Sequence, residues 1–251
     1  MPIVRTLDDG IAVLSLELPR GNAIDPAFMD AFGAALDETR KEGARAVVIT
    51  GRGKVFCGGL DLLAIGAYDR PTLEGFLDAF EAMFERILTY PHPVVAAVNG
   101  HAIAGGAILA MSADYRIMAP GAFQIGVNEV MLGIPFPAAA FEIVRRGTPD
   151  RSASTVLMQG RRFSPEEAVA AGIVHRLAGE GGVLADAIEE ARRFSLGGVD
   201  AVADTKADLV APVLARIEAT RAARRERFLA RWFAPEAQAR VAALREQLGK
   251  R

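Results

Sequence analysis

Cysteine is almost missing from this chain, since Cys57 is the only one among its 251 residues. A single cysteine cannot form an internal disulfide bond, which excludes a disulfide-stapled fold and favours a reducing compartment. Histidine is also scarce. His92, His101 and His175 lack the spacing of a metal site, so we expect no bound metal. No apolar run approaches the roughly 20 residues that span a bilayer, so we expect no membrane partner.

An excess of charge of either sign is absent as well. The 29 lysines and arginines against 31 aspartates and glutamates give a net charge of −2, and we therefore expect no nucleic-acid partner. The first five residues lack the basic region and long apolar stretch of a signal peptide, so we expect a cytoplasmic protein. Hydrophobic residues make up 51 % of the chain and the mean hydropathy is +0.21, which is ample for the core of one medium α/β domain.

Strand-like and helix-like segments alternate through the first part of the chain. An amphipathic helix is expected over residues 72–90, where apolar side chains recur at the spacing i, i+3, i+4, i+7. The apolar segments that we expect to be strands are 11–18, 46–50, 94–98 and 115–118. Alternation of this kind favours a mainly parallel sheet with helical crossovers, and we predict one α/β core over residues 1–195.

The character of the sequence changes after residue 195. Strand signals vanish, and alanine, arginine and glutamate dominate the rest of the chain. We predict helices over 200–231 and 235–248, within a C-terminal helical segment spanning 196–251. The arginines of this segment favour a solvated helix face over a polyanion site, because glutamates are interspersed among them.

Two glycine turns could carry chemistry. Gly58 and Gly59 follow the apolar Val55-Phe56-Cys57, and Gly105 and Gly106 open a helical run. Glycines allow tight turns that leave backbone N–H groups uncovered, and the first N–H groups of a helix attract negative charge. Together the two turns could offer two N–H groups to one oxygen that gains charge in a reaction. Taken singly, each turn is equally consistent with ordinary packing of a helix on a strand.

A single carboxylate stands among apolar neighbours at Glu129, within the segment 125–135. Burial in such surroundings would raise its pKa toward values that suit a proton shuttle. The alternative is an ordinary surface glutamate in a loop, and the sequence alone does not separate the two.

Three other reactive residue types are better explained by structure than by catalysis. Cys57 has no histidine or asparagine placed to activate it, so we expect a small buried packing residue. His101 lies beside the second glycine turn, where a structural role is favoured over that of an acid or base. Ser112 lacks the flanking glycines of a nucleophile elbow.

Taken in order, these pieces resemble the crotonase superfamily, the enoyl-CoA hydratases and isomerases, over nearly the whole chain. The motifs that carry the resemblance are 19–23 (PRGNA), 56–62 (FCGGLDL), 99–106 (NGHAIAGG), 114–117 (DYRI), 128–134 (NEVMLGI) and 164–174 (SPEEAVAAGIV). Each motif is modest alone, and their order and spacing in one chain are specific.

The resemblance implies a crotonase-like spiral of ββα units with a C-terminal helical trimerisation segment. It also implies homotrimers or hexamers built as dimers of trimers, and a coenzyme A thioester as substrate with no separate cofactor. The N–H groups of Leu60 and Gly105 would form the oxyanion hole, and Glu129 would be the catalytic acid and base. The residues expected to bind substrate are Arg20, Gly21, Ala23, Gly58, Gly59, Leu60, Asp61, Leu62, Gly105, Gly106, Asn128, Gly133, Ile134 and Pro135.

One departure from the family pattern bears on the reaction. Hydratases of this family carry a second glutamate three residues after the oxyanion glycine, and this chain has Ile108 there. Syn addition of water wants two carboxylates, whereas migration of a double bond needs one. The segment 125–134 also resembles the 3,2-enoyl-CoA isomerases in particular. The first hypothesis is therefore a 3,2-enoyl-CoA isomerase; the alternatives are an enoyl-CoA hydratase and a catalytically inert acyl-CoA-binding subunit.

Overall fold

The computed structural model describes residues 3–249. Residues 1–2 and 250–251 lie outside this range, so the expectations for the first five residues and for the end of segment 196–251 fall partly beyond it. The larger sheet has six strands in this range, in the order β1-β2-β3-β5-β7-β9. Their bounds are β1 (Ile3–Asp8), β2 (Ile11–Leu16), β3 (Ala46–Gly51), β5 (Val94–Val98), β7 (Tyr115–Met118) and β9 (Arg176–Leu177). β1 and β2 pair antiparallel, and every later pair in this sheet is parallel.

A second, smaller sheet holds the short strands β4 (Val55–Cys57), β6 (His101–Ile103) and β8 (Ile125–Gly126), in that order and all parallel. The chain crosses from the larger sheet to the smaller one three times, from β3 to β4, from β5 to β6 and from β7 to β8. Helical structure follows each of these strand pairs. This is a repeated ββα unit, and the predicted crotonase-like α/β fold class is confirmed.

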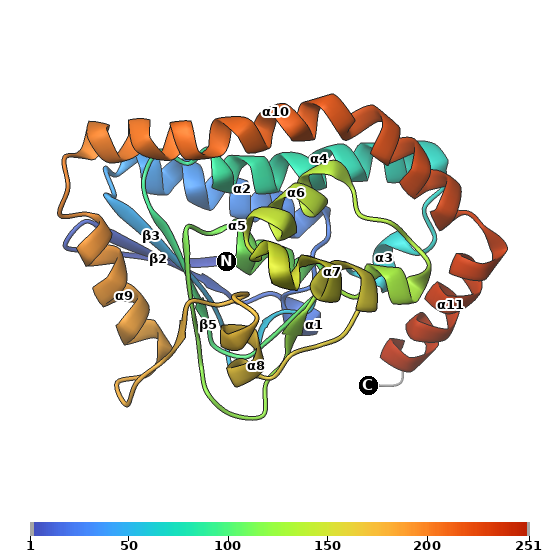
Figure 1. Cartoon of the computed structure of the whole chain (residues 1–251), viewed down its shortest axis with the longest axis horizontal. Helices are drawn as coiled ribbons and strands as arrows, with labels where there is room; N and C mark the ends of the chain where they lie inside the picture. The colour runs from blue at the N-terminus through green and yellow to red at the C-terminus, as the bar shows by residue number, and fades with distance from the viewer. Residues whose placement is uncertain (1–2, 250–251) are drawn as a thin grey trace.

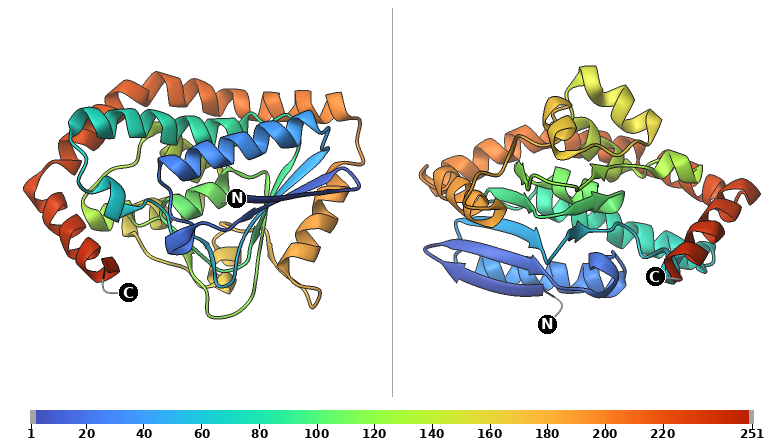
Figure 2. Two further views of the ribbon diagram at one scale, coloured as in Figure 1. Left: turned by 180° about the vertical axis from the view of Figure 1, so that it is seen from behind. Right: turned by 90° about the horizontal axis from the view of Figure 1, so that it is seen from below.

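The helices cover both faces of the larger sheet. Their bounds are α1 (Pro19–Asn22), α2 (Pro26–Lys41), α3 (Leu62–Ile65), α4 (Arg70–Leu88), α5 (Gly105–Ser112), the 3-10 helix η1 (Glu129–Leu132), α6 (Ala138–Arg146), α7 (Asp150–Gln159), α8 (Pro165–Ala170), α9 (Val183–Phe194), α10 (Val199–Trp232) and α11 (Pro235–Gly249). Figure 1 shows α10 along one side of the molecule, where it packs on α4 and α6. Figure 2 gives two further views of the same layers, and α9 packs against β3, β5 and β7.

Strand alternation sorts the side chains between two clusters. Val47, Ile49 and Ala96 face the main core, which also contains the buried side chains of α4 and α5. Val48 and Val95, one position away, face α9 in a smaller cluster. Because side chains of a strand point alternately to opposite faces, an all-apolar strand such as β5 needs cover on both sides. The two helical layers supply that cover.

The predicted helices are close to those observed. The amphipathic helix expected over 72–90 is α4, which begins two residues earlier because the Asp69 carboxylate caps it by accepting the Thr72 N–H. The C-terminal helices expected over 200–231 and 235–248 are α10 and α11. Trp232 and Phe228 of α10 are buried in the main core. The division at residue 195 stays a prediction.

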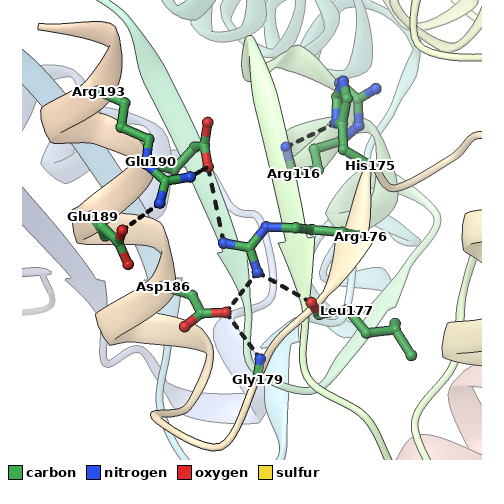
Figure 3. A network of polar contacts seen from close by, with 9 residues as sticks. All are labelled: Arg116, His175, Arg176, Leu177, Gly179, Asp186, Glu189, Glu190 and Arg193. Atoms are coloured by element: carbon green, nitrogen blue, oxygen red, sulfur yellow. Dashed lines mark hydrogen bonds and ion pairs between the residues drawn. The ribbon is translucent and has the colours of Figure 1, made fainter. Parts of the chain in front are cut away.

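A polar network closes the β9 edge of the larger sheet (Figure 3). The buried Arg116 side chain donates to the Ile173 carbonyl at 2.7 Å, and burial lowers its pKa to about 10. The Arg116 N–H donates to His175 Nδ1 at 3.1 Å, and burial together with Arg116 lowers the pKa of His175 to about 4. Arg176 reaches from β9 to Asp186 of α9 at 2.6 Å. These contacts fasten β9 to β7 and to α9.

Within residues 3–249, no helix combines the length and apolarity needed to cross a membrane.

Helix α5 lies so close to β4 that only glycine fits at the contact. A Cβ added to Gly106 would lie 2.0 Å from the Cys57 carbonyl oxygen. Because that oxygen belongs to the main chain, it cannot move aside to relieve the clash. Gly75 in α4 is the contrasting case, since a Cβ there would meet nothing within 4 Å. The first glycine is required by packing and the second is not.

We expect Gly106→Ala to lower the free energy of unfolding by about 2–4 kcal/mol, through overpacking against main chain. The control Gly75→Ala should raise it by about 0.5–1 kcal/mol, because alanine is the better helix former. Urea unfolding followed by circular dichroism measures both. Equal stability of the two variants would show that α5 does not approach β4 as described.

Candidate active site

The three strands of the small sheet end at one edge, and a chemically distinctive residue follows each of them. Leu60 comes shortly after β4, Gly105 after β6 and Glu129 after β8. Because the strands are parallel and adjacent, their carboxyl ends lie side by side. The topology therefore gathers two glycine turns and one carboxylate that are far apart in the sequence.

The pairing of Leu60 with Ile24 orients the Leu60 backbone. Ile24 N–H donates to the Gly59 carbonyl at 2.7 Å, and Asp61 N–H donates to the Ile24 carbonyl at 2.9 Å. In a parallel bridge, the residue that lies between the two bonded residues, here Leu60 between Gly59 and Asp61, directs its own N–H to the opposite side. The Leu60 N–H is consequently turned away from Ile24, and it finds no acceptor within residues 3–249.

Gly105 supplies a second free N–H at the start of α5. The first N–H groups of a helix have no partner in the preceding turn, and this one donates to nothing in the described part of the chain. Ala104, just before it, has φ of +50°, a strained conformation for a residue with a Cβ. A Cβ on Gly59 would lie 3.1 Å from the Gly105 nitrogen, and a Cβ on Gly105 would lie 3.6 Å from the Leu60 nitrogen. The two N–H groups are therefore neighbours.

Glu129 is a buried carboxylate without a cation beside it. Its exposed fraction is 8 %, and its Oε2 atom has no hydrogen-bond partner in the described structure. Burial raises its pKa to about 7, although main-chain hydrogen bonds from Glu129 and Asn128 oppose that rise. Asn128 Oδ1 is also buried and unpartnered. A carboxyl group with this pKa can both accept and return a proton near neutral pH.

A hollow of about 380 Å³ adjoins these groups, and we call it the main pocket. Its walls come from the small sheet, from η1 and from α11. The lining residues are Arg20, Gly21, Val55, Gly58, Leu60, Leu62, His101, Ile103, Ala104, Gln124, Asn128, Glu129, Leu132, Ile134, Arg162, Leu244 and Leu248. Ile108 is not among them; it lies 1 % exposed in the core on α5. Glu129 is thus the one carboxylate of this lining.

An ion pair fixes one residue of the pocket lining. Arg20, with φ of +53°, bonds the carboxylate of Asp61, and Asp61 is 3 % exposed. The same carboxylate caps α3 by accepting the N–H groups of Leu63 at 3.1 Å and Ala64 at 3.3 Å. Asp61 therefore anchors a cation at the pocket while its own charge is satisfied by main chain.

The three side chains set aside on sequence grounds have structural contacts. Cys57 is fully buried, its Sγ donates to the Asn22 carbonyl at 3.0 Å, and burial raises its pKa to about 12. His101 Nδ1 accepts the Gln124 N–H at 3.1 Å, and Ser112 Oγ donates to the Ile108 carbonyl at 2.8 Å. Across residues 3–249, no three His, Cys, Asp or Glu side chains gather closely enough to hold a metal ion.

The structure brings together most of the residues expected to bind substrate. Seven of them line the main pocket: Arg20, Gly21, Gly58, Leu60, Leu62, Asn128 and Ile134; Glu129, expected to be catalytic, lines it as well. Five others, Gly59, Asp61, Gly105, Gly106 and Ala23, belong to or adjoin the turns behind that lining. Gly133 and Pro135 line a separate hollow against α10.

Sequence reasoning missed several lining residues. Gln124 precedes β8, and Arg162 precedes Phe163, which bridges to Ile125. Their position depends on a long-range pairing for which no local pattern exists. Leu244 and Leu248 come from α11, which contacts α3 and η1 of the same chain. An apolar face on that helix is the signal that could have found them.

Comparison with known proteins agrees with this geometry. The sequence matches the enoyl-CoA hydratase/isomerase family model over residues 6–246. It is 38 % identical over 186 residues to a putative enoyl-CoA hydratase of Thermus thermophilus, covering 70 % of this chain and 71 % of that one. It is 33 % identical over 191 residues to carnitinyl-CoA dehydratase of Salmonella typhi, covering 75 % and 72 %.

The fold gives a further match. The structure resembles human mitochondrial delta3-delta2-enoyl-CoA isomerase with a TM-score of 0.94 at 26 % identity, covering 100 % of this chain and 99 % of that one. The chain belongs to the enoyl-CoA hydratase/isomerase family, a family of enzymes within the crotonase superfamily. The resemblance identified from the sequence motifs is thereby confirmed.

The raised pKa of Glu129 predicts how stability depends on pH. Between about pH 4.5 and pH 7 the folded state holds a proton that the unfolded state has released, so wild-type stability falls as pH rises. Glu129→Gln does not titrate. We expect the unfolding free energy of the variant, relative to wild type, to grow by about 3 kcal/mol from pH 4 to pH 8.

Urea titrations at several pH values measure this difference. The matched control is Glu180→Gln, at an exposed loop position, which should leave the pH profile unchanged. Parallel profiles for wild type and Glu129→Gln would mean that this carboxyl is not desolvated.

Proposed function

We propose that this protein isomerises 3-enoyl-CoA to 2-enoyl-CoA. The observation that carries the proposal is one buried carboxylate, Glu129, which lines the same pocket as Leu60, whose free N–H group neighbours the free N–H group of Gly105. The similarity to human delta3-delta2-enoyl-CoA isomerase supports it. A carboxylate and two main-chain donors are the groups that proton migration through an enolate requires.

The reaction follows from the roles of these groups. Ionised Glu129 removes a proton from C2 of the 3-enoyl thioester, and the electron pair of the C–H bond moves toward the thioester oxygen. The Leu60 and Gly105 N–H groups hold that oxygen of the dienolate. Protonated Glu129 then returns its proton at C4, which leaves the double bond between C2 and C3. No water enters and no group leaves, so one carboxyl suffices.

The pocket fits the remainder of such a substrate. Arg20 lines the pocket as a half-exposed cation that can meet the phosphates of coenzyme A while it stays paired with Asp61, and Ile134 and Leu132 provide apolar wall for the acyl chain. We further propose that the enzyme is cytoplasmic and acts in fatty-acid β-oxidation. It would assemble as a homotrimer or as a dimer of trimers. The thioester is the substrate, and no separate cofactor takes part.

A second candidate is an enoyl-CoA hydratase, because the Thermus thermophilus relative carries that name. Hydration would need another group to orient water, and the family position for it is the buried Ile108. Ile108→Glu in this chain is expected to create or raise hydration of 2-hexenoyl-CoA. Substantial hydration by the wild type would favour the hydratase instead.

We expect Glu129→Gln to lower the rate of double-bond migration in 3-hexenoyl-CoA by about 10²- to 10⁴-fold or more, because the proton carrier is lost. Absorbance of the conjugated enoyl thioester follows the reaction, and calorimetric titration with hexanoyl-CoA should show binding within about threefold of wild type. Glu180→Gln is the control and should remain fully active. Full turnover by Glu129→Gln would remove this carboxyl from the mechanism.

A loss of absorbance with 2-hexenoyl-CoA identifies the hydratase. An unchanged signal with both substrates, with binding retained, identifies a catalytically inert acyl-CoA-binding subunit. Each of the three hypotheses therefore has its own outcome in one assay.

A further inference from the structure

Ile134 separates the main pocket from a second hollow and lines both. It is 3 % exposed, and its N–H donates to the Glu129 carbonyl at 3.3 Å, so its position is fixed relative to the carboxylate. Gly133 before it adopts φ of +78° at the end of η1, which turns the chain between the two spaces. The two spaces therefore adjoin at this residue.

The second hollow, which we call the rear hollow, has a volume of about 570 Å³. One wall is the segment after Glu129, with Val130, Gly133, Ile134 and Pro135. The opposite wall is α10, with Arg227, Ala230 and Arg231. Most of these side chains are apolar, and the exceptions are two arginines one helical turn apart on the same face.

Those two arginines differ from the others on α10. Arg216 pairs with Glu142, Arg221 with Glu85 and Arg225 with Asp78. Arg224 lies over the Phe141 ring at 3.9 Å.

In contrast, within residues 3–249 neither Arg227 nor Arg231 has a carboxylate within 4.0 Å, and the Nε of Arg227 donates only to the Ala223 carbonyl at 3.3 Å. The rear hollow thus combines apolar walls with two cations that are free to bind an anion.

We propose that the rear hollow binds the distal end of an acyl chain that terminates in a carboxylate, the chain of an ω-carboxyacyl-CoA. This inference rests on the proposed function for the acyl-CoA ligand. The chain extends from the main pocket past Ile134, its methylene groups lie against Val130, Pro135 and Ala230, and its terminal carboxylate meets Arg227 and Arg231. Guanidinium groups bind carboxylates in paired hydrogen bonds, which an apolar chain end cannot use.

The test uses saturated thioesters, which bind without reacting, so its result does not depend on isomerase activity. Dissociation constants are measured by calorimetry for hexanoyl-CoA, dodecanoyl-CoA and the mono-CoA ester of dodecanedioic acid. The quantity of interest is the ratio of the dissociation constant of dodecanoyl-CoA to that of the dioic ester. The double variant Arg227→Met with Arg231→Met keeps side-chain bulk and removes both charges.

We expect the ratio to fall about fivefold in the double variant, while hexanoyl-CoA binding stays unchanged. High salt should reduce the ratio for wild type and leave that of the variant unaltered. An unchanged ratio overturns the proposal. Equal weakening of all three ligands also overturns it, because the arginines would then serve the phosphates of coenzyme A.

A second variant tests the path of the chain separately. Ala230→Phe places a ring in the rear hollow from an exposed position on α10. It should weaken binding of both twelve-carbon ligands severalfold and spare hexanoyl-CoA. Unchanged binding of the twelve-carbon ligands would show that long chains leave the main pocket by another route. If no thioester binds wild type at all, the proposed function fails along with this inference.

Discussion

The close contact between two main-chain turns is the constraint on which the candidate site depends. Gly106 lies against the Cys57 carbonyl and Gly59 against the Ile103 carbonyl, at distances that exclude any Cβ. The contact forces the Leu60 and Gly105 N–H groups together, and the helix beginning at Gly105 adds its positive end. Because these donors are main chain, no side-chain rearrangement is needed to aim them. Electrostatic stabilisation of this kind works through groups already oriented before charge develops.

The two buried carboxylates at the site differ in their hydrogen-bond partners. Asp61 and Glu129 are both buried, yet Asp61 receives two N–H groups and an arginine, whereas one oxygen of Glu129 has no partner. Burial without a partner penalises the ionised form of Glu129. In the proposed reaction the same fold thus uses Asp61 as a fixed anchor for Arg20 and Glu129 as the proton carrier. The desolvation of Glu129 and the strained backbone of Ala104 both cost stability, which the extensive main core offsets.

The sequence predicts the longer elements and the central residues of the site, and it fails where information is not local. Helix α4 has the periodicity of a helix, and strands β3 and β5 contain continuous apolar runs typical of buried strands. Strands β4, β6 and β8 are two or three residues long, too short for any alternation to be recognised, although they position the whole site. Glu129, Leu60 and Gly105 were found through motifs beside those strands. Gln124 and Arg162 reach the main pocket only because distant segments fold back, so no pattern around them indicates it.

Under the proposed function, Ile108 is the position that separates the isomerase from the hydratase on a shared scaffold. Every residue of α5 is buried, so a carboxylate at position 108 would lose its hydration and, if near enough to Glu129, would also repel it. Two coupled acids would share their protons, and neither pKa would belong to a single residue. With an isoleucine there, the pKa of Glu129 depends chiefly on its own burial and on a few main-chain donors. That simplicity suits a reaction in which one group must give back the proton that it takes, and it leaves no second acid to orient a water molecule.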